Sequence, residues 1–316
     1  MISLLIKSLL IFLISLLAVH AAMPAFLRKA KSRGMVARDM YKPGKPFVPT
    51  MGGLVMIAAV FLGLVAALFF VPTVVPLFIF YFIVFSFGLY GLADDLLGFK
   101  KSNGKVLVLF FVALPIALIT TDTNLSLIFF NMELGTFYAL VFAPLYVMIV
   151  ANLINMYEGY NGLGLGLSLI ILIFAVVKLA LRSDMGNVVY LMPLLGVMFG
   201  MLPYNSFPAM ALLGNVGTFM LGAGVGVFLV LAGMEFFGVI ILFPHIVNFL
   251  MWIIWCIRRL PHIKFARVNG DGTIRPPNWL SMKYLVTKLF RLTEPQAVLV
   301  CYAITTFFGI IGLILG

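Results

Sequence analysis

Long runs of apolar residues, each about the length of a membrane-spanning helix, follow one another along most of the chain. A helix that crosses the hydrocarbon core of a bilayer needs about 20 mostly apolar residues. The first run is too long for the apolar region of a signal peptide, so we expect it to be retained. The pattern predicts an all-α, polytopic membrane protein with about ten spans, near residues 2–22, 51–70, 76–93, 106–121, 134–154, 164–182, 187–203, 216–233, 236–256 and 295–315.

Composition supports a membrane protein and excludes an ordinary soluble one. Of the 316 residues, 64% are hydrophobic and 10% are charged, and the mean hydropathy is +1.19. Soluble domains carry about 25% charged residues. Cys256 and Cys301 lie far apart among apolar residues, so the sequence predicts neither a disulfide framework nor a Cys/His metal site. We expect a single transmembrane domain over residues 1–316.

The positions of Lys and Arg predict which loops face the cytoplasm. Eighteen of the 21 basic residues lie in three segments, near 23–50, 94–105 and 257–294. With ten crossings these segments share one side of the membrane. The positive-inside rule assigns this side to the cytoplasmic face of the cell membrane. Both termini would then be extracytoplasmic. The net charge of +11 therefore reflects topology and not nucleic-acid binding, although the basic loops would also favour an anionic membrane surface or substrate.

Two adjacent acids form the first group of candidate functional residues. Asp94 and Asp95 end an apolar run and precede a Lys cluster that includes Lys105. Carboxylates near hydrocarbon are costly and are functional candidates for that reason. Together with Lys they suit a Mg²⁺–diphosphate site, because Mg²⁺ prefers hard oxygen ligands. A hydrated helix end explains a lone Asp-Asp pair equally well.

Three amides and one acid form the second group, in a further cytoplasmic loop expected near 155–163. Asn152, Asn155 and Glu158 are spaced three residues apart, so on a helix they share neighbouring parts of one face, and Asn161 follows a glycine. Their oxygens and amides suit a polar ligand such as a nucleotide. Polar helix–helix packing would explain one or two of these residues but accounts poorly for all four.

Two further cytoplasmic segments contain candidates. The segment near 204–215 ends in Gly214 and Asn215, where a new helix is expected to begin and to present free N–H groups to an anion. In the loop near 257–294, three basic side chains would clamp a diphosphate or a sugar; a topology signal is the equal alternative for each of them. They are His262, Lys264 and Arg267.

Taken together and in this order, the motifs resemble the polyprenyl-phosphate N-acetylhexosamine-1-phosphate transferases across nearly the whole chain. Members of this family include the bacterial phospho-MurNAc-pentapeptide translocase and the eukaryotic UDP-GlcNAc–dolichyl-phosphate GlcNAc-1-phosphotransferase. Each motif is short, but their joint order, spacing and sidedness are specific. The matching stretches are Pro49-Thr50-Met51-Gly52-Gly53-Leu54, Asp94-Asp95, Asn155-Met156-Tyr157-Glu158-Gly159-Tyr160-Asn161-Gly162-Leu163, Asn205 with Pro208, and Gly214-Asn215.

The resemblance implies a reaction and a role for most of these residues. A polyprenyl phosphate would attack the β-phosphate of a UDP-sugar and release UMP, with Mg²⁺ or Mn²⁺ as cofactor. Asp94 and Asp95 would position or deprotonate the lipid phosphate, which residues 148–156 would guide, and Lys105 would face the phosphates. The implied metal ligands are Asn155 and Asn215; the implied substrate contacts are Gly52, Gly53, Leu54, Asn152, Glu158, Asn161 (at the uridine), His262, Lys264 and Arg267.

The chain departs from the family pattern at two positions. The family usually has Asp after the glycine, and this chain has Asn215, so the metal site loses a charge. In the bacterial branch a Phe two residues before that pair stacks on uracil, and here the position is Leu212. Stacking on the base must therefore come from elsewhere or be weaker.

The last cytoplasmic loop favours one branch of the family. It lacks the run of histidines that is typical of the pentapeptide-binding branch, and His262 and Lys264 stand where the dolichyl branch has arginines. We therefore expect UDP-GlcNAc and dolichyl phosphate as substrates, in an archaeal form that begins lipid-linked oligosaccharide synthesis for N-glycosylation. A related UDP-HexNAc or MurNAc-type transferase for cell-surface polymers and, from another class, a membrane transporter are the alternatives. The sequence leaves open whether the chain forms a homodimer.

Overall fold

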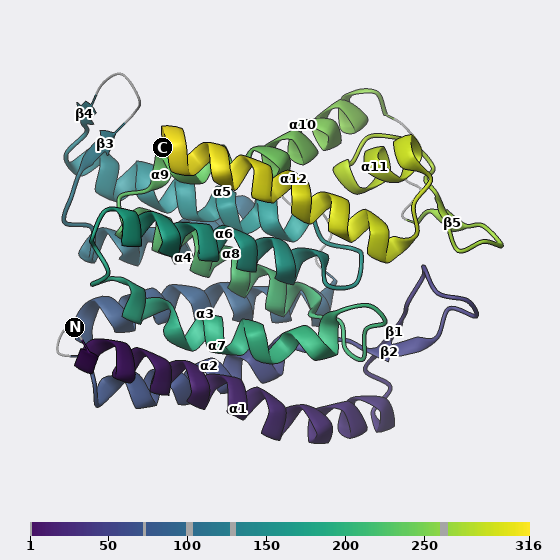
Figure 1. Ribbon diagram of the computed structural model, residues 1–316, viewed down its shortest axis with the longest axis horizontal. Coiled ribbons are helices and arrows are strands. Elements are labelled where there is room, and N and C mark those ends of the chain that lie inside the picture. Colours follow the sequence, from purple (N-terminus) through teal and green to yellow (C-terminus); the bar gives the residue numbers. More distant parts are fainter. Residues whose placement is uncertain (1, 72–73, 99–103, 127–130, 260–264) are drawn as a thin grey trace.

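The computed structural model describes residues 2–71, 74–98, 104–126, 131–259 and 265–316. Within these ranges the fold is almost entirely helical (Figure 1). The helices are α1 (Ile2–Ser32), α2 (Gly53–Leu68), α3 (Val74–Leu97), α4 (Gly104–Ala113), α5 (Ala143–Met156), α6 (Leu163–Leu181), α7 (Val188–Asn205), α8 (Gly214–Leu231), α9 (Glu235–Ile241), α10 (Phe243–Ile257), α11 (Met282–Phe290) and α12 (Glu294–Leu315). A 3₁₀ turn (Leu114–Leu118) extends α4, and a π-helical turn (Tyr138–Phe142) precedes α5.

The expected all-α membrane fold is confirmed. Each predicted apolar run contains a helix, and seven helices of the described chain are long and apolar enough to cross a membrane. An eighth candidate is the pair α9 and α10, which bends by 65° at its break. The remaining two runs form shorter apolar helices, α2 and α4 with its 3₁₀ turn. The number of crossings and the side of the termini stay predictions.

In the part of the chain that the structure describes, three antiparallel hairpins, which the apolar pattern did not reveal, connect the helices. They pair β1 (Val36–Arg38) with β2 (Phe47–Pro49), β3 (Asn124–Ser126) with β4 (Asn131–Glu133), and β5 (Arg267–Val268) with β6 (Ile274–Arg275). Helix α1 also runs ten residues beyond the predicted span, so its last basic side chains project from helix instead of loop. These elements are short or polar, and hydropathy alone is a poor guide to them.

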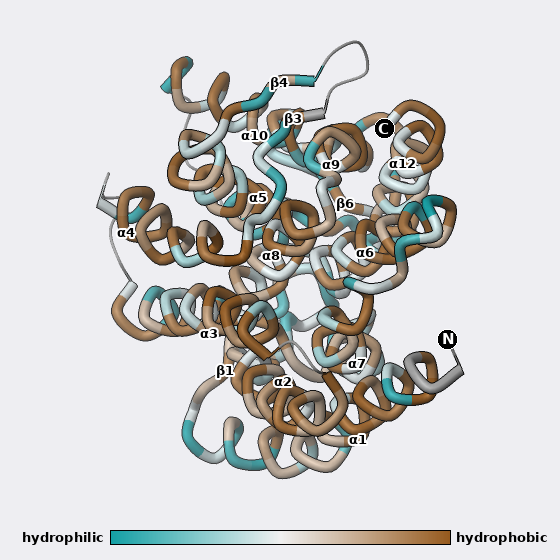
Figure 2. The backbone as a smooth tube through the Cα atoms, turned by 90° about the vertical axis from the view of Figure 1, so that its left-hand side faces the viewer, coloured by the Kyte–Doolittle hydropathy of each residue, from teal (hydrophilic) through white to brown (hydrophobic). Residues whose placement is uncertain are grey.

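Helix α8 occupies the centre of the bundle, with α3 and α5 as its main neighbours (Figure 2). Small residues allow this close packing. A Cβ added at Gly222 would lie 2.6 Å from the Cα of Ala151, and one at Gly226 would lie 3.0 Å from the Cα of Val147. Helices in a membrane associate through such close approach, because the bilayer supplies no hydrophobic drive between them.

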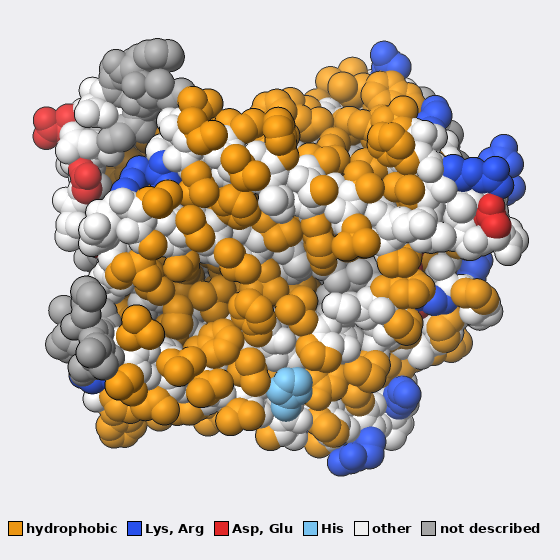
Figure 3. Space-filling view, in the orientation of Figure 1, with side chains coloured by type: hydrophobic (Ala, Val, Ile, Leu, Met, Phe, Trp, Pro, Cys, Tyr) orange, Lys and Arg blue, Asp and Glu red, His pale blue; other side chains and the backbone are white. Residues whose placement is uncertain are grey.

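The two ends of the bundle differ in charge. Both termini and the β3–β4 hairpin lie at one end in Figure 1, and the β1–β2 and β5–β6 hairpins and α11 lie at the other. Most Lys and Arg side chains visible in Figure 3 lie at the end that carries the β1–β2 and β5–β6 hairpins and α11. We call this the basic end. The middle of that face is covered by apolar side chains. This agrees with a bundle whose apolar middle sits in a bilayer, and the side that the basic end faces stays a prediction.

Candidate active site

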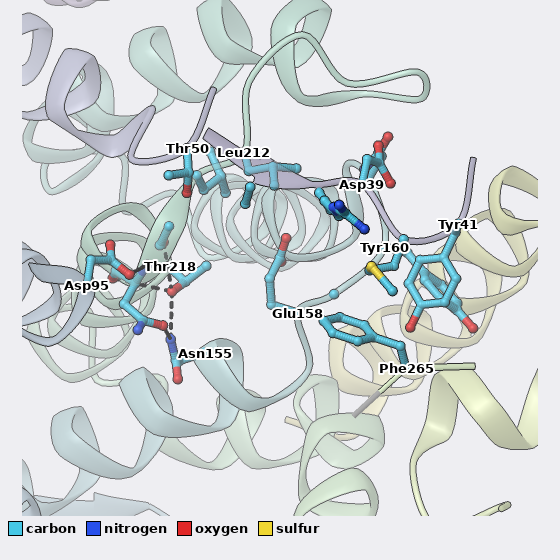
Figure 4. Close-up of a pocket in the computed structure, with 18 residues that line it drawn as sticks. Asp39, Tyr41, Thr50, Asp95, Asn155, Glu158, Tyr160, Leu212, Thr218 and Phe265 are labelled. Carbon is cyan, nitrogen blue, oxygen red and sulfur yellow. Dashed lines mark hydrogen bonds between the residues drawn. The ribbon is translucent and has the colours of Figure 1, made fainter. Parts of the chain in front are cut away.

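A cavity of about 280 Å³ lies at the basic end (Figure 4). Segments far apart in the sequence form its walls, and five of the predicted site residues line it. The lining residues are Ala37, Arg38, Asp39, Met40, Tyr41, Thr50, Asp95, Asn155, Glu158, Gly159, Tyr160, Asn161, Leu212, Leu213, Gly214, Asn215, Thr218 and Phe265. The carboxylates and amides of α3, α5 and α8 gather at one end, and aromatic rings gather at the other.

Asp95 binds the start of α8. Its Oδ1 accepts a hydrogen bond from the backbone N–H of Asn215 at 3.0 Å, and its Oδ2 accepts one from Val216 at 3.1 Å. The first N–H groups of a helix have no partner within the helix, and a carboxylate there is stabilised by the helix dipole. Gly91 makes the approach possible, because a Cβ at that position would lie 2.3 Å from the Asn215 carbonyl oxygen.

Asp94, in contrast, binds two side chains. Its Oδ1 lies 2.7 Å from the Lys105 ammonium, and its Oδ2 accepts a hydrogen bond from Asn215 Nδ2 at 3.0 Å. Both members of the ion pair are partly exposed, at 27% for Lys105 and 18% for Asp94. The two adjacent acids therefore differ in kind, since one holds a helix terminus and the other holds a cationic side chain.

Asn155 brings α5 to the same point. Its Nδ2 donates to Asn215 Oδ1 at 3.0 Å and to Thr218 Oγ1 at 2.7 Å. No group of three or more His, Cys, Asp or Glu side chains suited to a metal ion occurs within the described ranges. The oxygen donors here are instead two carboxylates with amide and hydroxyl oxygens, which are hard ligands of the type that Mg²⁺ accepts. The donor set therefore fits a hard divalent cation.

Three aromatic residues form the opposite end of the cavity. The rings of Tyr41 and Tyr160 meet edge to face, with centroids 4.9 Å apart, and Phe265 lies 6.4 Å from Tyr41. Burial raises the pKa of both the Tyr41 and Tyr160 phenols, so they stay neutral near pH 7. The Phe265 side chain lines the cavity and is 39% exposed.

Glu158 lies between the two ends of the cavity (Figure 4). Its Oε2 is buried and has no hydrogen-bond partner in the described part of the chain. Burial raises the pKa of Glu158 to about 7, and the charge of Lys283 offsets part of this effect. Burial likewise lowers the pKa of Lys283 to about 8, while its Nζ donates to the Glu158 backbone oxygen at 2.6 Å. This wall of the cavity therefore carries a carboxyl group that can gain or lose a proton near neutral pH.

Asn161 is bound by the protein more extensively than the sequence suggested. Its Oδ1 accepts from Lys42 Nζ and from the Ala209 N–H at 2.9 Å, and its own N–H donates to Glu294 Oε1 at 2.7 Å. Lys42 Nζ also lies 2.7 Å from Glu294 and 2.8 Å from Asp39. We expect Asn161 to contact uridine, but its side-chain Oδ1 is already bound within the chain.

Gly52, Gly53 and Leu54 lie outside the lining residues, contrary to the expectation that they line the pocket. The N–H groups of Gly52 and Gly53 donate to the carbonyl oxygens of Leu212 at 2.8 Å and Leu213 at 3.0 Å. A Cβ at Gly53 would lie 2.3 Å from the backbone nitrogen of Gly217. These residues therefore hold the cavity wall in place from behind, and Thr50 is the member of this motif that reaches the cavity.

Two other predicted contacts are likewise outside the cavity lining. The Asn152 amide donates to the Met148 carbonyl oxygen of its own helix at 2.8 Å, so α5 itself uses this polar group. Arg267 is exposed in β5, and its near neighbour Phe265 lines the cavity in its place. His262 and Lys264 lie outside the described residues.

Sequence reasoning missed the contribution of the loop before Pro49. Arg38, Asp39 and Tyr41 line the cavity, and Lys42 is buried behind them. The segment had been interpreted as a topology signal because of its positive charge. An acid placed among the basic residues was the available indication, since a pure topology signal has no need of Asp39.

Comparisons with known proteins agree with the motifs. The profile of glycosyl transferase family 4 matches residues 77–233, which include Asp94, Asp95, Asn155 and Asn215. A Saccharolobus solfataricus protein is 28% identical over 301 residues, covering 92% of this chain and 90% of its own length. It is provisionally named a UDP-N-acetylglucosamine–dolichyl-phosphate N-acetylglucosaminephosphotransferase.

Two further relatives span the archaeal and bacterial branches. A Sulfolobus acidocaldarius protein with the same provisional name is 28% identical and covers 90% of this chain and 88% of its own. A phospho-N-acetylmuramoyl-pentapeptide-transferase of Caldanaerobacter subterraneus is 32% identical and covers 63% of this chain and 66% of its own. The agreement of fold, motif order and relatives means that this multi-pass helical membrane protein belongs to glycosyl transferase family 4.

Proposed function

We propose that the protein transfers GlcNAc-1-phosphate from UDP-GlcNAc to dolichyl or another polyprenyl phosphate and releases UMP. This would be the first step of lipid-linked oligosaccharide synthesis for N-glycosylation. The single observation that carries the proposal is the cavity at the basic end, where Asp95, Asn155 and Asn215 converge from three helices. The names of the archaeal relatives, which align over about nine-tenths of this chain, support the choice of substrates.

The two ends of the cavity suit the two ends of a nucleotide-sugar. A pyrimidine ring fits the aromatic end, because an aromatic face stacks on a base whatever its hydrogen-bonding pattern. Phe265 and Tyr41 would then supply the stacking that Leu212 does not. The diphosphate would lie toward Asp94, Lys105 and the start of α8. Lys105 binds phosphate as a point charge once it leaves Asp94.

The reaction is a phosphoryl transfer that needs positioning more than covalent participation by the protein. An oxygen of the lipid phosphate forms a bond to the β-phosphorus of UDP-GlcNAc. The bond from that phosphorus to the bridging oxygen breaks, and the electron pair leaves with UMP. A phosphate monoester has a second pKa near 6, so the nucleophile is largely ionised at pH 7. We therefore propose that Asp94 mainly positions the side chains of Lys105 and Asn215, and that Asp95 positions the start of α8.

A divalent cation, Mg²⁺ in the first instance, is part of the proposal. Asp94, Asn155 and Asn215 would hold it, since their side chains hydrogen-bond to one another between α3, α5 and α8 and would turn their oxygens toward the ion. Bound there, it would neutralise charge on the diphosphate. Asn215 supplies an amide oxygen where the family usually has a carboxylate, so we expect weaker cation binding than in a protein with Asp.

The position of the cavity suits substrates that arrive from two phases. The basic end would lie on the cytoplasmic side of the cell membrane, as the Lys and Arg distribution predicts. UDP-GlcNAc would enter from water, and the lipid phosphate would diffuse within the bilayer to the end of α3 and α5. Apolar side chains exposed on α3, α4 and α5 are compatible with a hydrocarbon surrounding along that path.

The proposal is tested with purified protein in detergent or in nanodiscs. We would incubate it with UDP-[¹⁴C]GlcNAc, MgCl₂ and dolichyl phosphate, and measure UMP and labelled lipid. We expect both products in equal amounts, with loss of both when EDTA is added. Folded protein that gives neither product with any polyprenyl phosphate or UDP-HexNAc would exclude this function.

A second donor is favoured by one specific observation. The bacterial relative at 32% identity acts, by its name, on a phospho-N-acetylmuramoyl-pentapeptide, so a related UDP-HexNAc or MurNAc-type donor for cell-surface polymers is the alternative. The same assay separates the two, because unlabelled UDP-MurNAc-pentapeptide would compete with UDP-[¹⁴C]GlcNAc only if the cavity accepts it. A transporter of UDP-sugar, the remaining alternative, would move label into proteoliposomes without releasing UMP.

A further inference from the structure

A buried lysine joins several segments of the chain behind the aromatic end of the cavity. Lys42 lies between β1 and β2, and it is 9% exposed. Its Nζ lies 2.8 Å from Asp39 Oδ2 and 2.7 Å from Glu294 Oε2, and it also donates to Asn161 Oδ1. Glu294 Oε2 and Asn161 Oδ1 accept hydrogen bonds from this ammonium group, whereas Asp39 Oδ2 is held by its charge as an ion-pair partner.

The partners of Lys42 belong to the cavity walls. Asp39 and Asn161 line the cavity themselves. Asn161 Oδ1 also accepts from the Ala209 N–H, and Lys42 Nζ lies 4.4 Å from the centre of the Phe207 ring. The single ammonium therefore links the β1–β2 loop, the loop after α5, the loop before α8 and the first residue of α12.

This contact also fixes an aromatic pair. Tyr41 and Tyr160 immediately precede Lys42 and Asn161, and their rings meet at 4.9 Å and 89°. The bond from Lys42 to Asn161 holds the two backbone segments that carry the rings together, and this limits how far apart the rings can lie. We propose that Lys42 is a positioning residue that gives the aromatic end of the cavity its shape for the nucleobase. This proposal rests on the proposed function, which supplies the nucleotide.

The charge balance argues against a purely stabilising role. Asp39 and Glu294 are 4% and 2% exposed, so one buried cation faces two buried carboxylates. Burying such groups costs desolvation, and apolar replacements of buried ion pairs are often neutral or stabilising. An arrangement of this kind is better explained by the geometry that it imposes, here on three segments that line the cavity.

The first test compares substitutions at Lys42 with a matched control. Lys42→Met removes the two ion pairs and the hydrogen bonds and keeps the apolar stem, whereas Lys42→Arg keeps the charge in a planar group that cannot place all three contacts around one nitrogen. We expect Lys42→Met to raise the KM for UDP-GlcNAc roughly tenfold or more with a smaller fall in kcat, because displaced binding groups lose most of their effect. Lys42→Arg should recover part of this loss. Lys31→Met, at an exposed lysine at the end of α1, should change neither.

A double variant separates position from stability. Lys42→Met leaves Asp39 and Glu294 without their cation, so its Tm should fall. Adding Glu294→Gln removes one of the two unpaired charges, and we expect it to recover Tm but not KM, because Asn161 and Asp39 are still untethered. If Lys42→Met/Glu294→Gln recovers KM as well, Lys42 acts only by charge compensation and the proposal is wrong. An unchanged KM in Lys42→Met, with an active wild-type protein, overturns it equally.

Hydrogen exchange tests the proposal without turnover. We expect amides in residues 36–42 and 157–162 of Lys42→Met/Glu294→Gln to exchange at least about tenfold faster than in the wild-type protein. Amides in the middle of α8 should be unaffected. If both segments exchanged at the same rate in the double variant as in the wild-type protein, the positioning role would be refuted, whether or not the wild-type protein is active. A wild-type protein without turnover but with the expected exchange pattern would refute only the proposed function.

Discussion

The two ends of the cavity are built by different means. At the carboxylate–amide end, Asp94, Asp95, Asn155 and Asn215 project from α3, α5 and α8, which are packed at the centre of the bundle. At the aromatic end, Tyr41, Tyr160 and Phe265 come from loops that are held by buried charges. Rigid helices suit a place where charge must be positioned closely for chemistry.

The difference teaches where substitutions should act on rate and where on binding. Loops positioned by a rigid scaffold commonly carry recognition, and they vary more readily than the helices they connect. This chain has Leu212 where the bacterial branch has a stacking Phe, and it offers Phe265 across the cavity. We therefore expect changes at the helical end to lower kcat and changes at the loop end to raise KM.

The largest effect is expected for Asp95→Asn. The amide presents a donor to the N–H groups of Asn215 and Val216, so the start of α8 moves and Asn215 with it. We expect kcat, measured as UMP release, to fall roughly 100-fold or more, as when a charge-stabilising group is removed from an active site. Asp94→Asn keeps this helix cap and should leave Tm higher than Asp95→Asn does. The control is Asp184→Asn, because Asp184 is exposed at the opposite end of the bundle. If Asp95→Asn released UMP as fast as Asp184→Asn, the role assigned to Asp95 would be wrong.

Asn215→Asp should sharpen the metal dependence of the helical end. The hydrogen bond from Asn215 Nδ2 to Asp94 Oδ2 is replaced by repulsion between two carboxylates, so Tm should fall without a divalent cation. Mg²⁺ should restore it and should saturate turnover at a several-fold lower concentration than in the wild-type protein. The measurement is Tm and UMP release against free Mg²⁺, with Asn187→Asp as the control. A Tm that does not respond to Mg²⁺ would argue against a cation between these residues.

Phe265→Leu tests the loop end. Loss of the ring should raise the KM for UDP-GlcNAc about fivefold with little change in kcat, which corresponds to about 1 kcal/mol of base stacking. Adding Leu212→Phe, which returns a ring to the opposite wall, should recover most of the affinity. Phe290→Leu, an exposed ring on α11, should behave as the wild-type protein. A fall in kcat at unchanged KM would place Phe265 with the chemistry and break the comparison.

The smallest effect is the pH dependence contributed by Glu158. Its pKa is raised from 4.5 to about 7 by burial, so the folded protein binds this proton more tightly than the unfolded chain does. Stability should therefore fall as the pH rises from 4.5 to 7. Glu158→Gln should remove this fall and be the more stable protein at pH 8, by a few degrees in Tm, since 1 kcal/mol corresponds to roughly 2–4 °C in a large domain. If the Tm curves of Glu158→Gln and the wild-type protein ran parallel from pH 4.5 to 8, this role of Glu158 would be contradicted.

The sequence was informative wherever function followed from helix ends. Asp94 and Asp95, Asn155 and Asn215 lie within or next to helices whose apolar runs are visible in the sequence, and their one-sidedness followed from counting Lys and Arg. Their mutual hydrogen bonds in the structure agree with the group that the motifs predicted. Roles for these residues in catalysis and metal binding stay predictions.

The sequence was a poor guide where contacts span long distances along the chain. Lys42 meets Asn161 across 119 positions and Glu294 across 252. Nothing in the local pattern distinguishes it from the other basic residues of its segment, which are exposed or only partly buried. Gly52 and Gly53 were expected to line the pocket because of their motif, yet they bind the backbone of residues 212 and 213 from behind.

The amino-acid sequence by itself determined the membrane fold and the polarity of its two ends. A membrane helix satisfies its own backbone hydrogen bonds and lies in an apolar surrounding, whether of lipid or of other helices, so its formation depends on local composition. The tertiary structure alone decided which polar residues share the cavity, that Asp95 binds the α8 terminus while Asp94 binds Lys105, and that Lys42 is buried among three polar partners. Such contacts depend on how distant segments pack, and that information is spread over the whole chain.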